Sequence, residues 1–288
     1  MKIAVLGPKG TFSDKAYLEY EKKHKDITFE PEYYPTIDEV FSAVCPGDCQ
    51  MGIVPVENTL DGYVQRTLDL LLEKELQIVD ENMVEVQFSL VGNVCSIEEI
   101  EKLYVQFKAN GQCRQFINSL NYVKIISTDS NMESFYKLED EKGAAAIVPA
   151  HITETERDRF VVGNVTDASN NHTRFLIIKK GNVDSDRVRE FKCANDIMGK
   201  KGKVRVPVYI MPATDRPGIL FEILKSFNEK QINMISIMSR PTKHELGTYN
   251  FYIEIDGAYS QLDVIIDTLR DMKEFNDIKI LGIYNEQS

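Results

Sequence analysis

The sequence predicts an α/β protein with a mostly parallel sheet, followed by a small ferredoxin-like module. In residues 1–182, short apolar runs alternate with amphipathic helical runs, which is typical of strands that alternate with helices. Residues 183–202 break this periodicity with charge and glycine, which indicates a linker. Residues 203–288 follow the order β-α-β-β-α-β. A chain of 288 residues, 43% of them hydrophobic, is long enough for both domains.

Four strand-loop-helix units are expected in the first part. Each consists of an apolar run, a turn rich in small residues and a helical run that begins near a capping residue. The expected units are strand 2–7 with helix 12–24, strand 50–58 with helix 59–74, strand 123–128 with helix 129–138, and a strand and short helix within 142–153.

The loops of these units are the expected place for a ligand, because such sheets bind ligands beyond the carboxyl ends of their strands. The loops read "GPKGTFS" at 7–13, "PVENTLDG" at 55–62 and "STDSNM" at 127–132. The likeness of "GIVPVENT" to "AAIVPAHIT" hints that two similar lobes face each other across a cleft.

The C-terminal module has its own regular pattern of elements. Pro217 is expected near the first turn of its first helix, where a proline is tolerated. The expected elements are strand 203–211, helix 216–231, strands 232–241 and 248–257, helix 260–275 and strand 278–285.

Charge and cysteine content exclude several classes of protein. The net charge is −11, of which −9 lies in residues 1–202, so a nucleic acid would be repelled. No apolar stretch is long enough to span a membrane, and no signal peptide is recognisable. The five cysteines are odd in number and scattered, which favours free thiols and a cytoplasmic location; no metal site is expected from their spacing. These cysteines are Cys45, Cys49, Cys95, Cys113 and Cys193.

The loop "GPKGTFS" has two interpretations. It lacks both the phosphate-binding pattern G-x-x-x-x-G-K-[ST] and the dinucleotide pattern G-x-G-x-x-G. It could bind an anion through the N–H groups of Gly10, Thr11 and Phe12, helped by the Lys9 ammonium. The alternative is a tight turn between a strand and a helix, which this loop taken alone favours.

Two further motifs carry groups that can do chemistry. In "VENT", capping explains Asn58 or Thr59 but not the Glu57 carboxylate. In "HTRF", Arg174 can grip a carboxylate, and Thr173 can pass a proton to a leaving oxygen or can merely open a strand. His172 is expected on the surface, since no second histidine or acid supports a triad.

The motifs together resemble those of prephenate dehydratase with a regulatory ACT domain. The matching stretches are "GPKGTFS", "VPVENTLDGYVQRTLDLL", "QCRQFI" and "NNHTRFLI", followed by "RPGIL" and "MSRP". The resemblance implies a two-lobed catalytic domain like the type II periplasmic binding proteins. It also implies conversion of prephenate to phenylpyruvate, water and carbon dioxide in cytosolic phenylalanine biosynthesis, without a cofactor. L-phenylalanine would be the effector, acting on a homodimer or homotetramer that assembles through ACT domains.

The resemblance also assigns residues and domains. The catalytic domain would be residues 1–182, with a second lobe at about 80–160, then the linker 183–202 and the ACT domain 203–288. Catalytic roles fall to Thr173, Glu57, Asn58 and Gln112. The substrate-binding residues would be Lys9, Gly10, Thr11, Thr59, Gly62, Ser127, Thr128, Arg174 and Phe175. Phenylalanine would bind Gly218, Ile219, Leu220, Asn233, Met234, Ser239, Arg240 and Pro241.

The chain departs from the family pattern in four places. Val105 stands where a serine is usual, and Phe88 where a histidine is common. "STDSN" replaces Ser-Thr-Ser-Ala-Ala and puts Asp129 near the expected anion, while Met238 replaces a glutamate in the module. These departures keep two alternatives open: a decarboxylase of prephenate that does not aromatise the ring, and an amino-acid sensor without catalysis.

Overall fold

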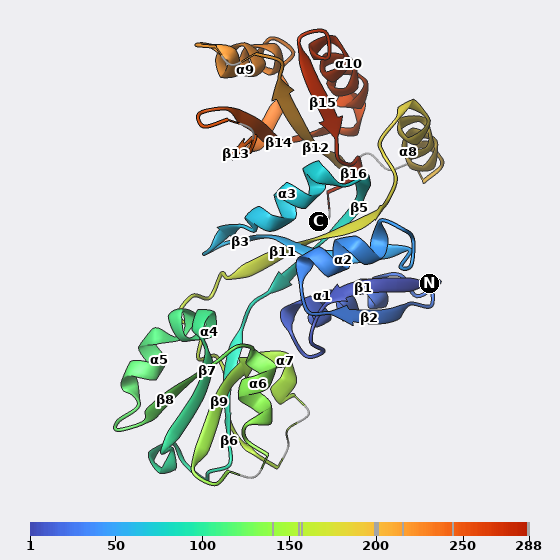
Figure 1. Cartoon of the computed structure of the whole chain (residues 1–288). Coiled ribbons are helices and arrows are strands. Elements are labelled where there is room, and N and C mark those ends of the chain that lie inside the picture. The colour runs from blue at the N-terminus through green and yellow to red at the C-terminus, as the bar shows by residue number, and fades with distance from the viewer. Residues whose placement is uncertain are drawn as a thin grey trace.

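The computed structural model describes residues 1–286 except 140, 155, 157, 199–201, 215 and 244, and it contains three sheets, each covered by helices (Figure 1). The first sheet belongs to an N-terminal lobe, the second to an inserted lobe and the third to the C-terminal module. The first lobe lies between the other two in Figure 1. The α/β class, the two lobes and the ferredoxin-like module are therefore as predicted.

The first lobe has the strand order β2-β1-β3-β11-β5, with β4 attached to β3. Strands β1, β2 and β3 are parallel, but β11 runs antiparallel to both β3 and β5, so the sheet is mixed rather than mostly parallel. Its elements are β1 (Lys2–Leu6), α1 (Phe12–Lys23), β2 (Glu30–Tyr34), α2 (Ile37–Val44), β3 (Met51–Asn58), β4 (Gly62–Tyr63), α3 (Gln65–Glu73), β5 (Leu76–Glu85) and β11 (His172–Lys180).

The second lobe is inserted between β5 and β11, so the chain passes twice between the lobes. Its sheet has the order β10-β6-β9-β7-β8 around an apolar core that includes Leu103, Val105 and Ile147. Its elements are β6 (Phe88–Gly92), η1 (Ile97–Glu99), β7 (Lys102–Gln106), α4 (Phe107–Gln112), α5 (Arg114–Ser119), β8 (Lys124–Thr128), α6 (Asn131–Tyr136), β9 (Ala144–Pro149), α7 (Ala150–Thr153) and β10 (Phe160–Val162).

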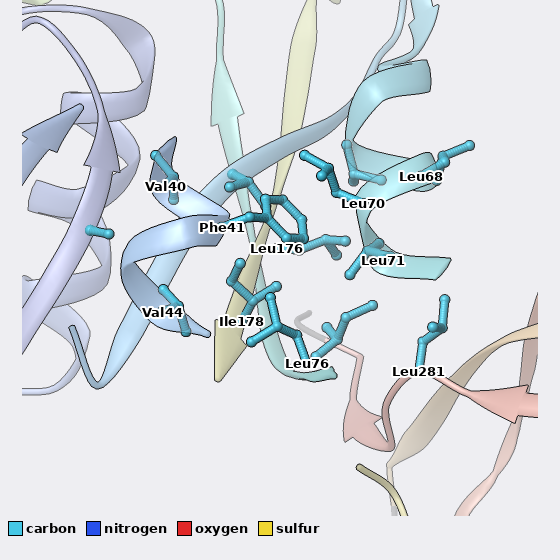
Figure 2. Packing of buried hydrophobic residues seen from close by; sticks show 14 of the residues in the cluster. Val40, Phe41, Val44, Leu68, Leu70, Leu71, Leu76, Leu176, Ile178 and Leu281 are labelled. Atoms are coloured by element: carbon cyan, nitrogen blue, oxygen red, sulfur yellow. The ribbon is translucent and has the colours of Figure 1, made fainter. Parts of the chain in front are cut away.

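The core of the first lobe continues into the C-terminal module. Helices α2 and α3 bury apolar side chains such as Phe41 and Leu71 against β11, as Figure 2 shows. Leu281 of the module packs into the same cluster. Tyr209 and Tyr252, on the sheet of the module, belong to it as well. The module is thus held to the first lobe by a shared apolar core.

The C-terminal module has the sheet order β13-β14-β12-β15, with β16 paired to β12. Helices α9 and α10 pack on one face around residues such as Phe227 and Leu269. The elements are β12 (Lys203–Pro212), α9 (Ile219–Glu229), β13 (Asn233–Pro241), β14 (Tyr249–Ala258), η2 (Tyr259–Gln261), α10 (Leu262–Met272), β15 (Asn276–Ile280) and β16 (Tyr284–Asn285).

Three local expectations are corrected by the structure. Most of the predicted linker forms helix α8 (Ser185–Met198), whose Val188 and Phe191 pack on the core of the module; residues 199–201 lie outside the described part. The helix expected at 59–74 begins only at Gln65, because Gly62 and Tyr63 pair with β3 as strand β4. Pro217 precedes α9 instead of entering it, since Gly218 at φ +90° is the N-cap.

None of the helices in the described residues is both long enough and apolar enough to cross a bilayer.

Candidate active site

A cavity of about 390 Å³ opens between the two lobes. Its lining comes from three loops of the first lobe and from two strand-to-helix junctions of the second, where loops of α/β folds gather ligand-binding groups. The polar lining residues are Thr11, Ser13, Asn58, Asp61, Gln106, Lys108, Gln112, Asp129, Ser130, Asn131 and Thr173. Of the residues predicted as catalytic or substrate-binding, five line it: Thr11, Asn58, Gln112, Thr173 and Phe175.

Asn58 and Thr173 form the centre of this site. They are directly opposite in the antiparallel pair β3 and β11, so strand pairing brings their side chains together. The Asn58 Nδ2 donates to Thr173 Oγ1 at 2.9 Å. A hydroxyl that accepts this bond keeps its own proton to donate elsewhere. Thr173 is therefore set up as a hydrogen-bond donor toward the cavity.

Gln112 reaches the same network from the second lobe. The buried Asn171 accepts from Asn58 Nδ2 at 2.8 Å and donates from its Nδ2 to Gln112 Oε1 at 3.0 Å. Since its oxygen is engaged, Gln112 has its amide N–H groups to offer to a ligand. The chain Thr173–Asn58–Asn171–Gln112 connects both walls of the cleft. Asn171 was not predicted as a site residue, although it precedes the motif "HTRF" directly.

The loop "GPKGTFS" is held by hydrogen bonds with nearby side chains. Asp14 accepts from the Gly10 amide at 2.8 Å and from the Tyr33 hydroxyl at 2.5 Å, and Thr11 caps α1 by accepting from the Asp14 amide. Gly10 has φ +89°, and a Cβ there would meet Met132 of the second lobe at 2.5 Å. Lys9 and Gly10 do not line the cavity. Gly10 thus lies in a tight turn closed by Asp14, while Thr11 borders the cleft.

Glu57 and Arg174 point to the opposite side of the sheet, contrary to the expected places in the cleft. Neighbouring residues of a strand face opposite ways, so side chains beside Asn58 and Thr173 face away from them. Both line a separate cavity of about 210 Å³, which β14 of the module also borders. Arg174 bonds Glu57 at 3.0 Å, Glu81 at 3.3 Å and Glu254 at 2.7 Å.

The electrostatics of this ion network leave Arg174 fully charged. Burial alone would lower the pKa of Arg174, but the Glu254 carboxylate, together with Tyr284 and Tyr252, outweighs it, and the net shift is upward. Burial also raises the pKa values of Tyr252 and Tyr284, which keeps these phenols neutral. With three carboxylates around it, Arg174 has no place for a carboxylate of a substrate.

Four other predicted residues lie beside the cavity instead of lining it. Thr128 is buried and shares a hydrogen bond of 2.6 Å with Ser134, and Ser127 lies next to it in β8. Thr59 donates to the His172 carbonyl oxygen at 3.1 Å, and Gly62 belongs to β4. Instead of Ser127 and Thr128, the loop that follows β8 contributes Asp129, Ser130 and Asn131 to the cavity lining.

The family departures fall in different surroundings. Val105 is 1% exposed within the core of the second lobe, so it is packing rather than lining. Phe88 lines the cleft and stacks edge-on against Phe12, with ring centroids 5.2 Å apart.

The cysteine next to Gln112 takes no part in chemistry at the cleft. Burial raises the pKa of Cys113 to about 12, so its thiol is no nucleophile.

Lys108 and Asp61 both line the cleft, although neither was predicted from the sequence as a site residue. One signal was available for Lys108, because residues four apart share one face of a helix and Gln112 was already a candidate. No sequence signal identifies Asp61 as its partner. Among the described residues, no group of three or more His, Cys, Asp or Glu side chains could hold a metal ion.

The residues predicted for phenylalanine do not form one cluster within a protomer. Asn233 and Met234 begin β13, whereas Ser239, Arg240 and Pro241 end this nine-residue strand. Asn233 bonds Asp256, and Arg240 bonds Asp69 of α3 at 2.8 Å. Gly218, Ile219 and Leu220 form the start of α9. Met238 packs against the core of the first lobe.

Comparison with known proteins agrees with this architecture. The profile of the prephenate dehydratase family matches residues 3–183, and that of the ACT domain matches residues 213–272. A prephenate dehydratase of Methanocaldococcus jannaschii is 30% identical over 96% of this chain and 95% of its own.

Two solved structures share the whole fold. The prephenate dehydratase of Staphylococcus aureus superposes with a TM-score of 0.79 at 29% identity, covering 99% of this chain and 100% of its own. That of Arthrobacter aurescens, solved in complex with L-Phe, has a TM-score of 0.82 at 26% identity and covers 99% and 90%. With its family profile, its two-lobed cleft and its C-terminal module, the chain belongs to the prephenate dehydratase family.

Proposed function

We propose that the chain converts prephenate to phenylpyruvate, water and carbon dioxide in the interlobe cleft, with Thr173 as the proton donor. The observation that carries this assignment is the 2.9 Å bond from Asn58 to Thr173 at the cavity wall. It directs the hydroxyl proton of Thr173 away from Asn58 and toward the cleft.

The reaction needs help at one atom. The bond to the ring carboxylate breaks and releases carbon dioxide, its electron pair enters the ring, and the bond to the ring hydroxyl breaks as the ring becomes aromatic. The departing oxygen must take up a proton. Thr173 donates it, Asn58 stabilises the charge that grows on Oγ1, and solvent restores the proton. A positioned acid of this kind accelerates a reaction by about 10² to 10⁴.

Gln112 and the apolar walls complete the site. The Gln112 amide donates to a substrate oxygen from the second lobe, so closure of the lobes brings the donors together. Phe12, Phe88 and Phe175 form apolar walls against which the cyclohexadiene packs, and they keep water out.

Control by L-phenylalanine is the second part of the proposal. Strand β13 lies at the edge of the module sheet, and its Ile235 and Ile237 are exposed. An open edge of this kind pairs readily with another copy. We expect a homodimer through β13, in which the residues predicted to bind phenylalanine, separated within one protomer, come together from two copies. We also expect a cytoplasmic location, since the five thiols are free.

The test of the activity is a turnover assay with prephenate that follows phenylpyruvate by its absorbance. Thr173→Ala is expected to lower kcat at least tenfold with little change in KM, and Thr173→Ser to retain most of the activity. A product that lacks an aromatic ring, or no product at all, would contradict the assignment.

The test of the control is a melting curve with and without L-phenylalanine, together with the oligomeric state by light scattering. A ligand at about 100 times its Kd stabilises a protein by about 2.7 kcal/mol. Unchanged melting and unchanged turnover at millimolar L-phenylalanine would remove the effector from the proposal.

A further inference from the structure

The cleft has an unusual charge for a site that accepts a dianion. Two carboxylates, Asp61 and Asp129, line it together with a single cation, Lys108, among the described residues. The cations expected from the sequence lie elsewhere, since Lys9 does not line the cavity and Arg174 is enclosed by glutamates. Prephenate carries two negative charges, so Lys108 is the one side chain there that can neutralise either of them.

Several backbone donors near the cleft are already engaged by side chains. The Gln106 side chain caps α4 by accepting from the amides of Lys108 at 2.7 Å and Ala109 at 3.3 Å. Ser130 accepts from the Glu133 amide at 3.0 Å at the start of α6, and Asp167 accepts from the first amides of α5. With these N–H groups bound to side chains, an anion depends all the more on the ammonium of Lys108.

Lys108 is held at the cleft by an ion pair that crosses between the lobes. Its Nζ lies 3.3 Å from Asp61 Oδ2, and the side chains are 68% and 42% exposed. The Asp61 amide donates to Asn58 Oδ1 at 3.0 Å, so the pair adjoins the residue that orients Thr173. An exposed pair contributes little free energy, so a better anion can displace Asp61.

We propose that Lys108 is a specificity-determining residue: it leaves Asp61 and binds the carboxylate of the substrate side chain, the one that the product retains. The ring carboxylate loses its charge as carbon dioxide departs, so an ammonium bound to it would stabilise the ground state more than the transition state. A bond to the side-chain carboxylate is present before and after the reaction and raises no barrier. The inference rests on the proposed function of the cleft.

The experiment compares Lys108→Met and Asp61→Asn with Lys137→Met, which removes another exposed lysine of the second lobe that does not line the cavity. Steady-state rates give kcat and KM for prephenate, and product inhibition gives Ki for phenylpyruvate. For Lys108→Met, KM and Ki are both expected to rise by about 10- to 100-fold, the value of a charge-assisted bond, while kcat changes little. For Asp61→Asn, KM should fall by about two- to fivefold, because the competitor is gone. Lys137→Met should match the wild type.

Each other outcome overturns part of the inference. If KM and Ki of Lys108→Met equal those of the wild type, the lysine has no role in binding. If KM rises and Ki does not, the lysine binds the departing carboxylate. If KM of Asp61→Asn rises, Asp61 does not compete. If the wild type itself turns over no prephenate, the proposed function fails, and calorimetric titration with phenylpyruvate then decides on Lys108 alone: equal affinities of wild type and Lys108→Met would refute it.

Discussion

Asn58 uses both ends of its amide at the site. Its Oδ1 accepts from the amides of Leu60 and Asp61, each at 3.0 Å, and this fixes the turn after β3. Its Nδ2 donates to Thr173 and to Asn171. The same side chain therefore shapes the loop that bears Asp61 and leaves the Thr173 hydroxyl free to donate toward the cleft.

Replacement of Asn58 by aspartate separates these roles. Aspartate keeps the acceptor for the turn but loses the donor, so the Thr173 hydroxyl would turn to donate to the new carboxylate instead of the substrate. We expect kcat of Asn58→Asp to fall at least about 100-fold. The double variant Asn58→Asp/Thr173→Ala should be about as slow as the slower single variant, because the two residues act as one unit. Steady-state kinetics measure this, and losses that multiply would show that the residues act separately.

At the scale of elements, strand β11 separates two environments. Thr173 and Phe175 face the cleft, while Arg174 enters the ion network between the first lobe and the module. Arg205 of β12 extends that network by bonding Glu81 at 3.0 Å. The position of the module sheet is thereby linked, through Arg174, to the strand that carries Thr173, the proposed proton donor.

Removal of the arginine tests the strength of this link. Arg174→Met would leave the buried Glu254 carboxylate without its cation, while Glu81 would keep Arg205, and breaking a buried pair costs about 3 to 5 kcal/mol. We expect a loss of this size in the free energy of unfolding from urea titration. The control is Arg216→Met, which breaks an exposed pair with Glu222 and should cost less than about 1 kcal/mol. Equal losses would mean that the buried network contributes no more than a surface pair.

At the scale of the molecule, side chains of the module bind α3 of the first lobe at several points. Arg240 bonds Asp69 in the middle of the helix, and Lys279 Nζ bonds the carbonyl oxygens of Leu71 and Leu72 near its end at 2.8 and 2.9 Å. A cation is favourable at that end of a helix. The Tyr209 hydroxyl donates to the Leu68 carbonyl oxygen at 2.9 Å. Helix α3 is thus one of the elements of the first lobe on which the module rests.

The Asp69 ion pair should make the contact between the module and α3 sensitive to acid. Burial alone would raise the pKa of Asp69, but Arg240 and Lys243 outweigh it, and the net shift is downward. A lowered pKa stabilises the folded state above the ordinary pKa of about 4 and loses that effect as the pH falls further. Asp69→Asn should therefore be less stable than the wild type by about 1 kcal/mol from pH 8 to 5, with a difference that shrinks below pH 4. Denaturation curves across this range measure it, and a difference that grows in acid would contradict the sign.

The sequence was sufficient for the architecture and for five of the residues that line the cleft. Alternating apolar and helical runs predicted the α/β lobes and the module, and the family motifs predicted Thr173, Asn58 and Gln112. The bond between Asn58 and Thr173 joins residues 115 positions apart, and only the pairing of β3 with β11 creates it. The domain boundaries and the assigned roles of the residues remain predictions.

The errors have physical causes. A motif gives the order of residues but not the face of the sheet, so Arg174 and Glu57 were assigned to the cleft although their neighbours occupy it. The linker looked aperiodic because α8 has apolar residues that pack on the module at few positions, among them Val188 and Phe191. The pair of Lys108 and Asp61 depends on how the lobes face each other, which no local pattern encodes.

The alternation along β11 also limits how this chain can change over evolution. Substitutions at Thr173 or Arg174 each affect one side of the sheet, but the gain or loss of one residue just before them would exchange the two sides. The guanidinium would then enter the cleft and the hydroxyl would lie among buried carboxylates, so both domains would be impaired by a single event. Length changes should be tolerated in the loops and selected against in the short stretch from Asn171 to Phe175.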